Sequence, residues 1–231
     1  MEASNLLDNL TVNPAVAGMD NSAIERLVEL LKLPETSWKQ KVAPSKATDP
    51  KVYMWRNVDN EDSSTCIYMK LDITVPDCTI DKMQKCFELG VRMQWEDNQE
   101  FTKIGDVQDG ALIYIVGPKP KLPMIDQRDF LSKFYHRDAY FVNADGSVGG
   151  HASVRVHGGE HASYPPKAGL TRGEEYICGQ IVIPAPEVNG VRLLGIIHRD
   201  MKGKLPEVVL QKAAEKAGPR FYEAVSKVIK T

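Results

Sequence analysis

Apolar residues recur at helical spacing in two parts of the chain. In DNSAIERLVELLKLP they fall on one stripe from Ile24 to Leu31 and stop at Pro34, which predicts a short amphipathic helix. From Leu210 to Val228 they follow a 3.6-residue period, which predicts a terminal helix of about 24 residues, roughly 36 Å long. Many of its apolar residues are alanine. Such a helix either approaches its neighbour very closely or leaves volume unfilled.

Between these helices the apolar pattern is mostly that of strands. KVYMWRNV and SSTCIYMKLDITV are expected to pair as a hairpin, and IDKMQKCFELGV, which follows, reads as one helix. Six further strands run from Phe101 to Asp200, separated by short turns such as QDG, NADGS and EVNG. These turns are too short for crossover helices, so the sheet should be antiparallel. The pattern indicates an α+β protein with about eight or nine strands.

Composition narrows the function classes. The formal net charge of −2 gives no basic surface for nucleic acid, and no apolar run approaches the roughly 20 residues that span a bilayer. The acidic N-terminus is unlike a signal peptide, and the four cysteines form no C-x-x-C pair, as expected of reduced thiols in a cytosolic protein. We expect a flexible tail over residues 1–20 and a single domain over residues 21–231, with a monomer favoured.

Catalytic and metal-binding motifs receive little support. HGGEH, from His157 to His161, matches a zinc-protease spacing, but its two glycines and its strand and loop surroundings disfavour the helix that this motif needs. We read it as a strand end running into a turn. No serine occupies a nucleophile elbow, and His136, His151 and His198 stand singly in strands. The sequence therefore predicts no metal site and no catalytic residue.

The loop from Gly117 to Asp126, GPKPKLPMID, combines prolines, lysines and an apolar tip. It can be a rigid surface loop. It can also be a gate that touches a membrane, with its lysines near anionic headgroups and its apolar residues inserted. The candidate membrane residues of this gate loop are Lys119, Lys121, Leu122, Met124 and Ile125.

Three motifs in order resemble one family. RDF at Arg128–Phe130, H...YPPKAGLTRGEEYICGQIVIPAP from His161 to Pro186, and DMKGKLP from Asp200 to Pro206 resemble the START domain family of lipid-transfer proteins. The resemblance runs from about Trp38 to Thr231. It implies a helix-grip fold, in which a curved antiparallel sheet surrounds a hydrophobic tunnel closed by the C-terminal helix. DMKGKLP would mark the change from the last strand to that lid helix.

The resemblance also suggests ligand-binding residues. On the lid helix these are Leu210, Ala214, Ala217 and Phe221. Strand alternation puts Leu112, Tyr114 and Val116 on one face and Phe130, Ser132 and Phe134 on another, and we expect both faces to look inward. Tyr114, Ser132 and Glu175 would then be the polar groups available to a headgroup, although ordinary core packing is the alternative for each.

Sterol-binding members of the family carry a buried acid and a buried arginine on neighbouring strands. Counting from Ile104 and from RDF, we place these positions at Val116 and Phe134, so both charges are absent together. Removing both avoids an unpaired buried charge. This absence favours a more apolar tunnel and an acyl lipid such as a phospholipid over a sterol.

The leading hypothesis is a non-enzymatic protein that binds one lipid and transfers or senses it, without a cofactor. It would be cytoplasmic, with transient contact to a membrane surface. Two alternatives remain: an enzyme of the helix-grip superfamily, such as a cyclase or hydrolase of apolar substrates, and an interaction adaptor with a filled tunnel.

Overall fold

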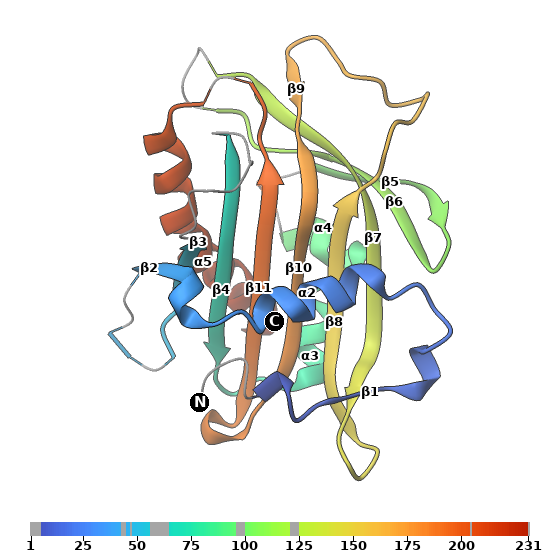
Figure 1. The fold of residues 1–231 in the computed structure, drawn as a ribbon, viewed down its shortest axis with the longest axis vertical. Helices are drawn as coiled ribbons and strands as arrows, with labels where there is room; N and C mark the ends of the chain where they lie inside the picture. The colour runs from blue at the N-terminus through green and yellow to red at the C-terminus, as the bar shows by residue number, and fades with distance from the viewer. Residues whose placement is uncertain are drawn as a thin grey trace.

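One large curved sheet organises the molecule (Figure 1). The computed structural model describes residues 6–42, 45–46, 48–55, 65–95, 100–120, 125–203 and 205–230, and only the backbone at 93–95, 207, 211, 214, 224 and 228–230. Nine strands follow one another in the order β2-β3-β4-β11-β10-β8-β7-β6-β5, and the short strands β1 and β9 add to β7. The neighbours along the main path are antiparallel, whereas β9 runs parallel to β7. The α+β helix-grip prediction is confirmed.

The strands have the following bounds: β1 (Thr11–Val12), β2 (Trp38–Val42), β3 (Lys51–Trp55), β4 (Cys66–Val75), β5 (Glu100–Val107), β6 (Gly110–Val116), β7 (Gln127–Val142), β8 (Val148–His157), β9 (Leu170–Arg172), β10 (Glu174–Ala185) and β11 (Gly190–Asp200). The expected hairpin is β3 with β4. LTRGEEYICGQIVI, taken as one strand, is divided at Gly173 into β9 and β10.

The outer face of the sheet carries α2 (Ser22–Leu31). This helix crosses β8, β10 and β11 in Figure 1, and its predicted apolar stripe from Ile24 to Leu31 is buried. The segment before it differs from the expected flexible tail. Leu7 and Val16 join the same apolar cluster, and Thr11 pairs with Val142 of β7. Residues 6–20 are therefore packed on the sheet, because they cover apolar surface at the edge of α2.

The inner face carries α3 (Ile80–Lys85), α4 (Leu89–Trp95) and α5 (Glu207–Lys230). The single helix expected over IDKMQKCFELGV is two helices, with Thr79 capping the first through the backbone N–H of Lys82. Gly90 lies inside α4 and does not end a helix. The long terminal helix is present as predicted and includes Pro219.

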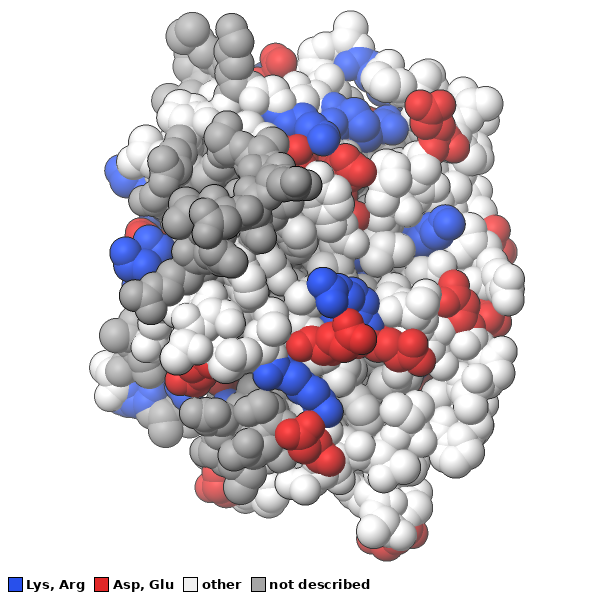
Figure 2. All heavy atoms as spheres, in the orientation of Figure 1, with Lys and Arg blue, Asp and Glu red and all other residues white. Residues whose placement is uncertain are grey.

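Apolar side chains on the inner face form three separate clusters. One joins Val52 and Leu71 to Leu210 of α5, a second joins Phe87 to β10 and β11, and a third gathers around Phe101 and Phe130. On the side seen in Figure 2, acidic and basic side chains are interspersed. Across the described part of the chain, no helix has the length and apolarity needed to cross a membrane.

Candidate functional site

The helix α5 lies very close to the sheet at Gly218. A Cβ placed on this glycine would lie 2.6 Å from Val52 Cγ2, closer than two carbon atoms pack. Leu210 is buried in the cluster that contains Val52, and Ala217 packs against it. The small residues of this helix allow either a close approach to the sheet or unfilled volume beside it. At Gly218 the helix approaches the sheet closely.

The second half of α5 covers the turn that follows α3. The ring of Phe221 stacks on that of Phe87 with centroids 5.9 Å apart. Leu210, Ala217 and Phe221 thus all contact the inner side of the molecule, and their role in lining a ligand site stays a prediction. The side chain of Ala214, also predicted to face the ligand, is outside the described residues.

Arg128 of the RDF motif connects three parts of the chain at the start of α5. Its guanidinium donates hydrogen bonds to the carbonyls of Met201 (3.2 Å) and Lys202 (3.1 Å), and to that of Asp126 at the end of the gate loop. Lys202 and Gly203 adopt left-handed backbone conformations with φ of 50° and 70°. This turn explains DMKGKLP: it reverses the chain between β11 and α5, and Arg128 binds the carbonyls it exposes.

The register of β6 and β7 corrects one expectation. Residues that pair across antiparallel strands share a face, and Tyr114 pairs with Leu131 while Ser132 pairs with Ile113. The set Phe130, Ser132 and Phe134 is on the inner face, where its two phenylalanines join a cluster with Leu89 of α4. The set Leu112, Tyr114 and Val116 is on the opposite face. The two sets cannot both look inward because their positions differ by one residue in register.

Tyr114 therefore belongs to a different buried network. Its hydroxyl donates to Asp129 Oδ2 at 2.8 Å, and Arg172 Nη2 lies 2.8 Å from the same oxygen. Lys167 lies 5.0 Å from the ring centroid of Tyr114, and Arg172 also donates to the carbonyl of Tyr164. Burial, together with the hydrogen bond and charge of Asp129, raises the pKa of Tyr114 to about 12. This network anchors β9 and the loop before it to β7.

The inner face holds a buried charged cluster, here called the arginine cluster: Arg155, Glu175, Arg199 and Ser132. Arg155 Nε lies 3.2 Å from Glu175 Oε2, and Arg199 Nη2 lies 3.5 Å from Glu175 Oε1. Ser132 Oγ donates to Glu175 Oε2 at 2.7 Å. The side chains of Arg155 and Glu175 are 3% and 0% exposed. Ser132 and Glu175 were expected here, whereas neither arginine was.

Aromatic rings border this cluster. Arg155 Cζ lies 5.7 Å from the ring centroid of Phe101, and Arg199 Cζ lies 5.3 Å from that of Phe130. Arg92 of α4 is also buried and approaches Phe101 at 5.9 Å. Guanidinium groups from α4, β8 and β11 thus face one apolar cluster, where cation–π contacts contribute to their stability.

The ionisation states in the arginine cluster follow from its charges. Burial opposes the charged form of Glu175, but the guanidinium groups of Arg155 and Arg199 outweigh it and hold the pKa of Glu175 below its usual value. Burial, with the nearby charge of Glu175, raises the pKa of the Cys178 thiol to about 11. At neutral pH the carboxylate is ionised and the thiol is neutral, so neither group is positioned for proton transfer near pH 7.

The register removes the basis on which a more apolar tunnel was expected. Val116 and Phe134, the positions assigned to the acid and arginine of sterol-binding members, pair with Asp129 and Ala111 and lie on opposite faces. The inner face instead carries buried charges from β8, β10 and β11. The pairing register of β6 and β7 separates the two positions. Residue spacing in the sequence does not reveal this register.

The base of the gate loop is described, but its tip is not. Gly117 and Arg128 are joined by a backbone hydrogen bond, and Gln127 Nε2 donates to the Gly117 carbonyl at 2.6 Å. Lys119 is exposed and Ile125 is half-buried. Lys121, Leu122 and Met124 lie outside the described residues.

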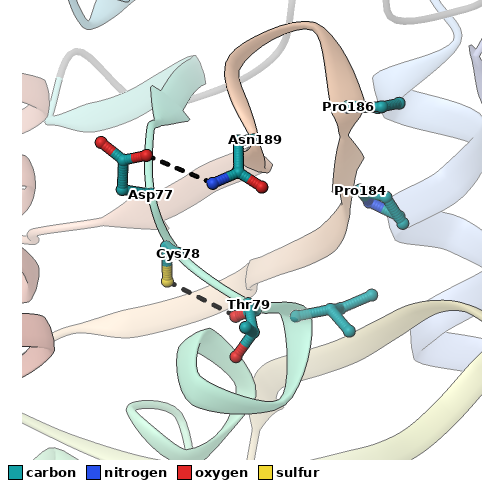
Figure 3. Close-up of a pocket in the computed structure, with 8 residues that line it drawn as sticks. Asp77, Cys78, Thr79, Pro184, Pro186 and Asn189 are labelled. Atoms are coloured by element: carbon teal, nitrogen blue, oxygen red, sulfur yellow. Dashed lines mark hydrogen bonds between the residues drawn. The ribbon is translucent and has the colours of Figure 1, made fainter.

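A hollow of about 410 Å³ lies elsewhere, between the loop before α3 and the turn that joins β10 to β11 (Figure 3). Asn189 Nδ2 donates to Asp77 Oδ1 at 3.3 Å across it, and the Cys78 thiol donates to the Thr79 carbonyl. None of the predicted ligand residues lines it. HGGEH ends β8 at His157 and continues as loop, as predicted.

Comparison with known proteins identifies the fold. The structure of human StAR-related lipid transfer protein 5 superposes with a TM-score of 0.73 at 23% identity, covering 94% of this chain and 97% of that one. The fold is that of a START domain. Human STARD10 gives a TM-score of 0.70 at 16% identity, over 91% of this chain and 79% of that one.

Sequence comparison agrees. StAR-related lipid transfer protein 5 of Homo sapiens is 29% identical over 146 residues, and that of Mus musculus is 27% identical over 146 residues. The match covers 61% of this chain and 64% of each relative, so it spans less than two thirds of their length. No protein-family model matches the chain. The resemblance of the chain to START domain proteins is therefore confirmed in fold and in sequence.

Proposed function

We propose that this START domain binds a single lipid between the inner face of its sheet and α5, and transfers or senses that lipid at membranes. The observation that carries the proposal is the arrangement of the inner face, where three apolar clusters face α3, α4 and α5. The relatives named as lipid transfer proteins support it. Burial of each CH2 group is worth about 0.8 kcal/mol, so a long acyl chain strongly favours such a site over water.

An acyl lipid is the proposed ligand class, with a phospholipid favoured over a sterol. The sequence placed the charge pair of sterol-binding members at Val116 and Phe134, but these residues lie on opposite faces, so identification of the bound lipid has to test this preference. The mechanism requires shielding alone: α5 and the gate loop part at the membrane, and the acyl chain leaves without crossing water. No cofactor takes part.

Native mass spectrometry tests ligand binding directly. The protein, purified from a eukaryotic host, is expected to carry one lipid per chain, which mass spectrometry of the extracted lipid then identifies. A protein that remains empty after incubation with mixed liposomes would contradict the proposal and favour an enzyme or an adaptor on the same fold.

A pair of variants on α5 tests where the lipid lies. Ala217→Trp places a large ring against the cluster of Val52 and is expected to abolish lipid transfer between vesicles. Lys216→Trp, at an exposed neighbouring position, is the matched control and should transfer normally. Circular dichroism shows whether both variants are folded. Normal transfer by a folded Ala217→Trp variant would contradict the position proposed for the ligand.

Membrane contact is proposed for the gate loop, where Lys119 is exposed next to the base fixed by Gln127 and Arg128. Each lysine near an anionic surface is worth about 1 kcal/mol. Lys119→Glu should therefore weaken flotation with phosphatidylserine vesicles, whereas Lys39→Glu on β2 should have little effect. Equal flotation of both variants would remove the loop from the proposal.

A further inference from the structure

Three polar side chains of the neighbouring strands β7 and β8 form a row on the inner face. Ser153 of β8 pairs with His136 of β7, and His136 Nδ1 lies 2.5 Å from Ser153 Oγ. On the other side of the ring, His136 Nε2 lies 2.9 Å from Asp138 Oδ1. A serine hydroxyl, an imidazole and a carboxylate in this order form the arrangement that activates serine as a nucleophile.

The contacts of His136 favour one tautomer of its ring. The Ser153 hydroxyl can donate to Nδ1 when the ring proton is on Nε2, next to the Asp138 carboxylate. Burial lowers the pKa of His136, so the ring is neutral at pH 7 and can accept a proton. Asp138 also receives a hydrogen bond from Gln84 of α3, which holds its carboxylate in place. His136 is therefore suited to act as a general base for Ser153.

A hydrogen-bond donor without a partner lies next to Ser153. Gln180 of β10 pairs directly with Ser153, so the two Cβ atoms are about 4.5–5.5 Å apart on the same face. Gln180 is 6% exposed, and its Nε2 has no hydrogen-bond partner in the described part of the chain. A buried donor of this kind can bind the negative oxygen that forms when a serine attacks an ester carbonyl. The inner face thus holds a nucleophile and, beside it, a donor for the reaction intermediate.

The surroundings of Ser153 determine which kind of ester can reach it. Ser153 is 3% exposed, and the ring of His136 stacks on that of Phe134 with centroids 6.2 Å apart. Phe134 belongs to the apolar cluster of Phe101 and Phe130. A substrate therefore has to lie along the apolar inner face, which favours an ester with a long acyl chain over a small polar ester.

We propose that the domain hydrolyses a carboxylic ester of the acyl lipid that it binds, with Ser153 as nucleophile, His136 as general base and Gln180 as donor to the carbonyl oxygen. The inference rests on the proposed function, because the substrate is the lipid held at the inner face. Asp138 is a positioning residue that orients the ring of His136.

The reaction has two steps. Ser153 Oγ forms a bond to the ester carbonyl carbon while its proton passes to His136 Nδ1, and the carbonyl oxygen accepts a hydrogen bond from Gln180 Nε2. The bond from that carbon to the alcohol oxygen then breaks, and the alcohol leaves with the proton from His136. Water, the second substrate, next attacks the acyl group and gives its proton to His136, which returns it to Ser153 as the fatty acid leaves.

An active-site probe tests the nucleophile directly. The full chain is incubated with a long-chain alkyl fluorophosphonate, whose phosphorus forms a bond to an activated serine oxygen as fluoride leaves. Mass spectrometry of peptides then locates the adduct. Ser153 should be labelled in the folded protein and not after unfolding in urea. An unlabelled Ser153, or labelling of another serine in its place, would overturn the assignment.

The release of 4-methylumbelliferone from 4-methylumbelliferyl oleate measures hydrolysis. Ser153→Ala should lower kcat/KM at least about a hundredfold, and Gln180→Met should lower it by a similar factor. Asp138→Asn keeps an acceptor for Gln84 and should lower kcat roughly tenfold with an unchanged KM. Ser163→Ala, at an exposed position of the loop after β8, is the matched control and should hydrolyse the ester normally.

The outcomes separate the inference from the function on which it rests. Native mass spectrometry after incubation with vesicles of a dialkyl ether phosphatidylcholine, which has no carboxylic ester, measures lipid binding without hydrolysis. If the ether lipid binds but Ser153→Ala, shown to be folded by circular dichroism, hydrolyses the oleate ester as fast as the wild type, the hydrolase assignment is overturned while lipid binding stands. If neither the ether lipid nor its ester analogue binds, the proposed function itself is overturned.

Discussion

The contact between Gly218 and Val52 predicts that Gly218→Ala destabilises the wild-type protein but stabilises a variant with a shorter side chain at position 52. Alanine is favoured over glycine inside a helix by about 1 kcal/mol. At position 218, however, the new Cβ would lie 2.6 Å from Val52 Cγ2, and overpacking of a core costs roughly 1–3 kcal/mol. Gly218→Ala should therefore lower the free energy of unfolding by up to about 2 kcal/mol.

Shortening Val52 should reverse this effect. Val52 is 0% exposed, so Val52→Ala costs about 2 kcal/mol through lost burial and the cavity it leaves. In that background the nearest remaining atoms to a Cβ at 218 are Pro50 Cβ at 3.5 Å and Leu71 Cδ2 at 3.7 Å, which is ordinary contact. Gly218→Ala should then stabilise the protein by about 1 kcal/mol, through helix propensity.

Urea unfolding of the wild type, both single variants and the double variant measures this cycle. Gly90→Ala is the control, because a Cβ there meets nothing within 4 Å and should not weaken the protein in either background. If Gly218→Ala stabilises the wild type as much as it stabilises Val52→Ala, the close contact of α5 with β3 is not present in solution. Under the proposed function, Gly218→Ala alone should also speed lipid exchange, because it moves α5 away from the sheet.

Three further predictions concern buried polar groups. Arg172→Met leaves the fully buried Asp129 carboxylate without its ion pair and should lower the free energy of unfolding in urea by about 3–5 kcal/mol, whereas an effect below 1 kcal/mol would show that Tyr114 alone suffices. Burial lowers the pKa of His136, so below roughly pH 6.5 the unfolded state binds a proton that the folded state does not. The free energy of unfolding should therefore fall from pH 7 to pH 5, and it should fall less steeply in His136→Gln. Parallel curves of unfolding free energy against pH for the two proteins would contradict this. Cys178, with a pKa raised to about 11, should resist iodoacetamide at pH 8 until urea unfolds the protein, and rapid labelling would contradict its burial.

The elements of the fold could be predicted from periodicity because each one has a single buried face. The stripe from Ile24 to Leu31 and the terminal helix are examples, and both helices are present. Two features were not predicted from the sequence because they depend on tertiary contacts. Residues 6–20 look like a tail until the sheet edge that they cover exists, and β9 separates from β10 at Gly173, where a Cβ would lie 2.3 Å from Phe130 Cε1.

The candidate site was predicted in part. Phe130, Ser132 and Phe134 were placed on the inner face because alternation along one strand is reliable. Tyr114 was misplaced because alternation gives two faces without saying which one meets the neighbouring strand, and a shift of one residue reverses the answer. The signal that could have corrected it is Asp129, since an acid next to the buried Phe130 has to face the other side and needs a partner there.

The strands that hold the arginine cluster show why Arg155 and Arg199 were not predicted from the sequence. Arg155, Glu175 and Arg199 stand in three different strands, up to 44 positions apart. Glu175 was expected to face inward, but each arginine alone looks like a solvated residue at a strand end. Only the ladder of β8, β10 and β11 brings them together on the inner face. Once buried, charged groups are costly unless each is compensated, and Glu175 lies within ion-pair distance of both Arg155 and Arg199.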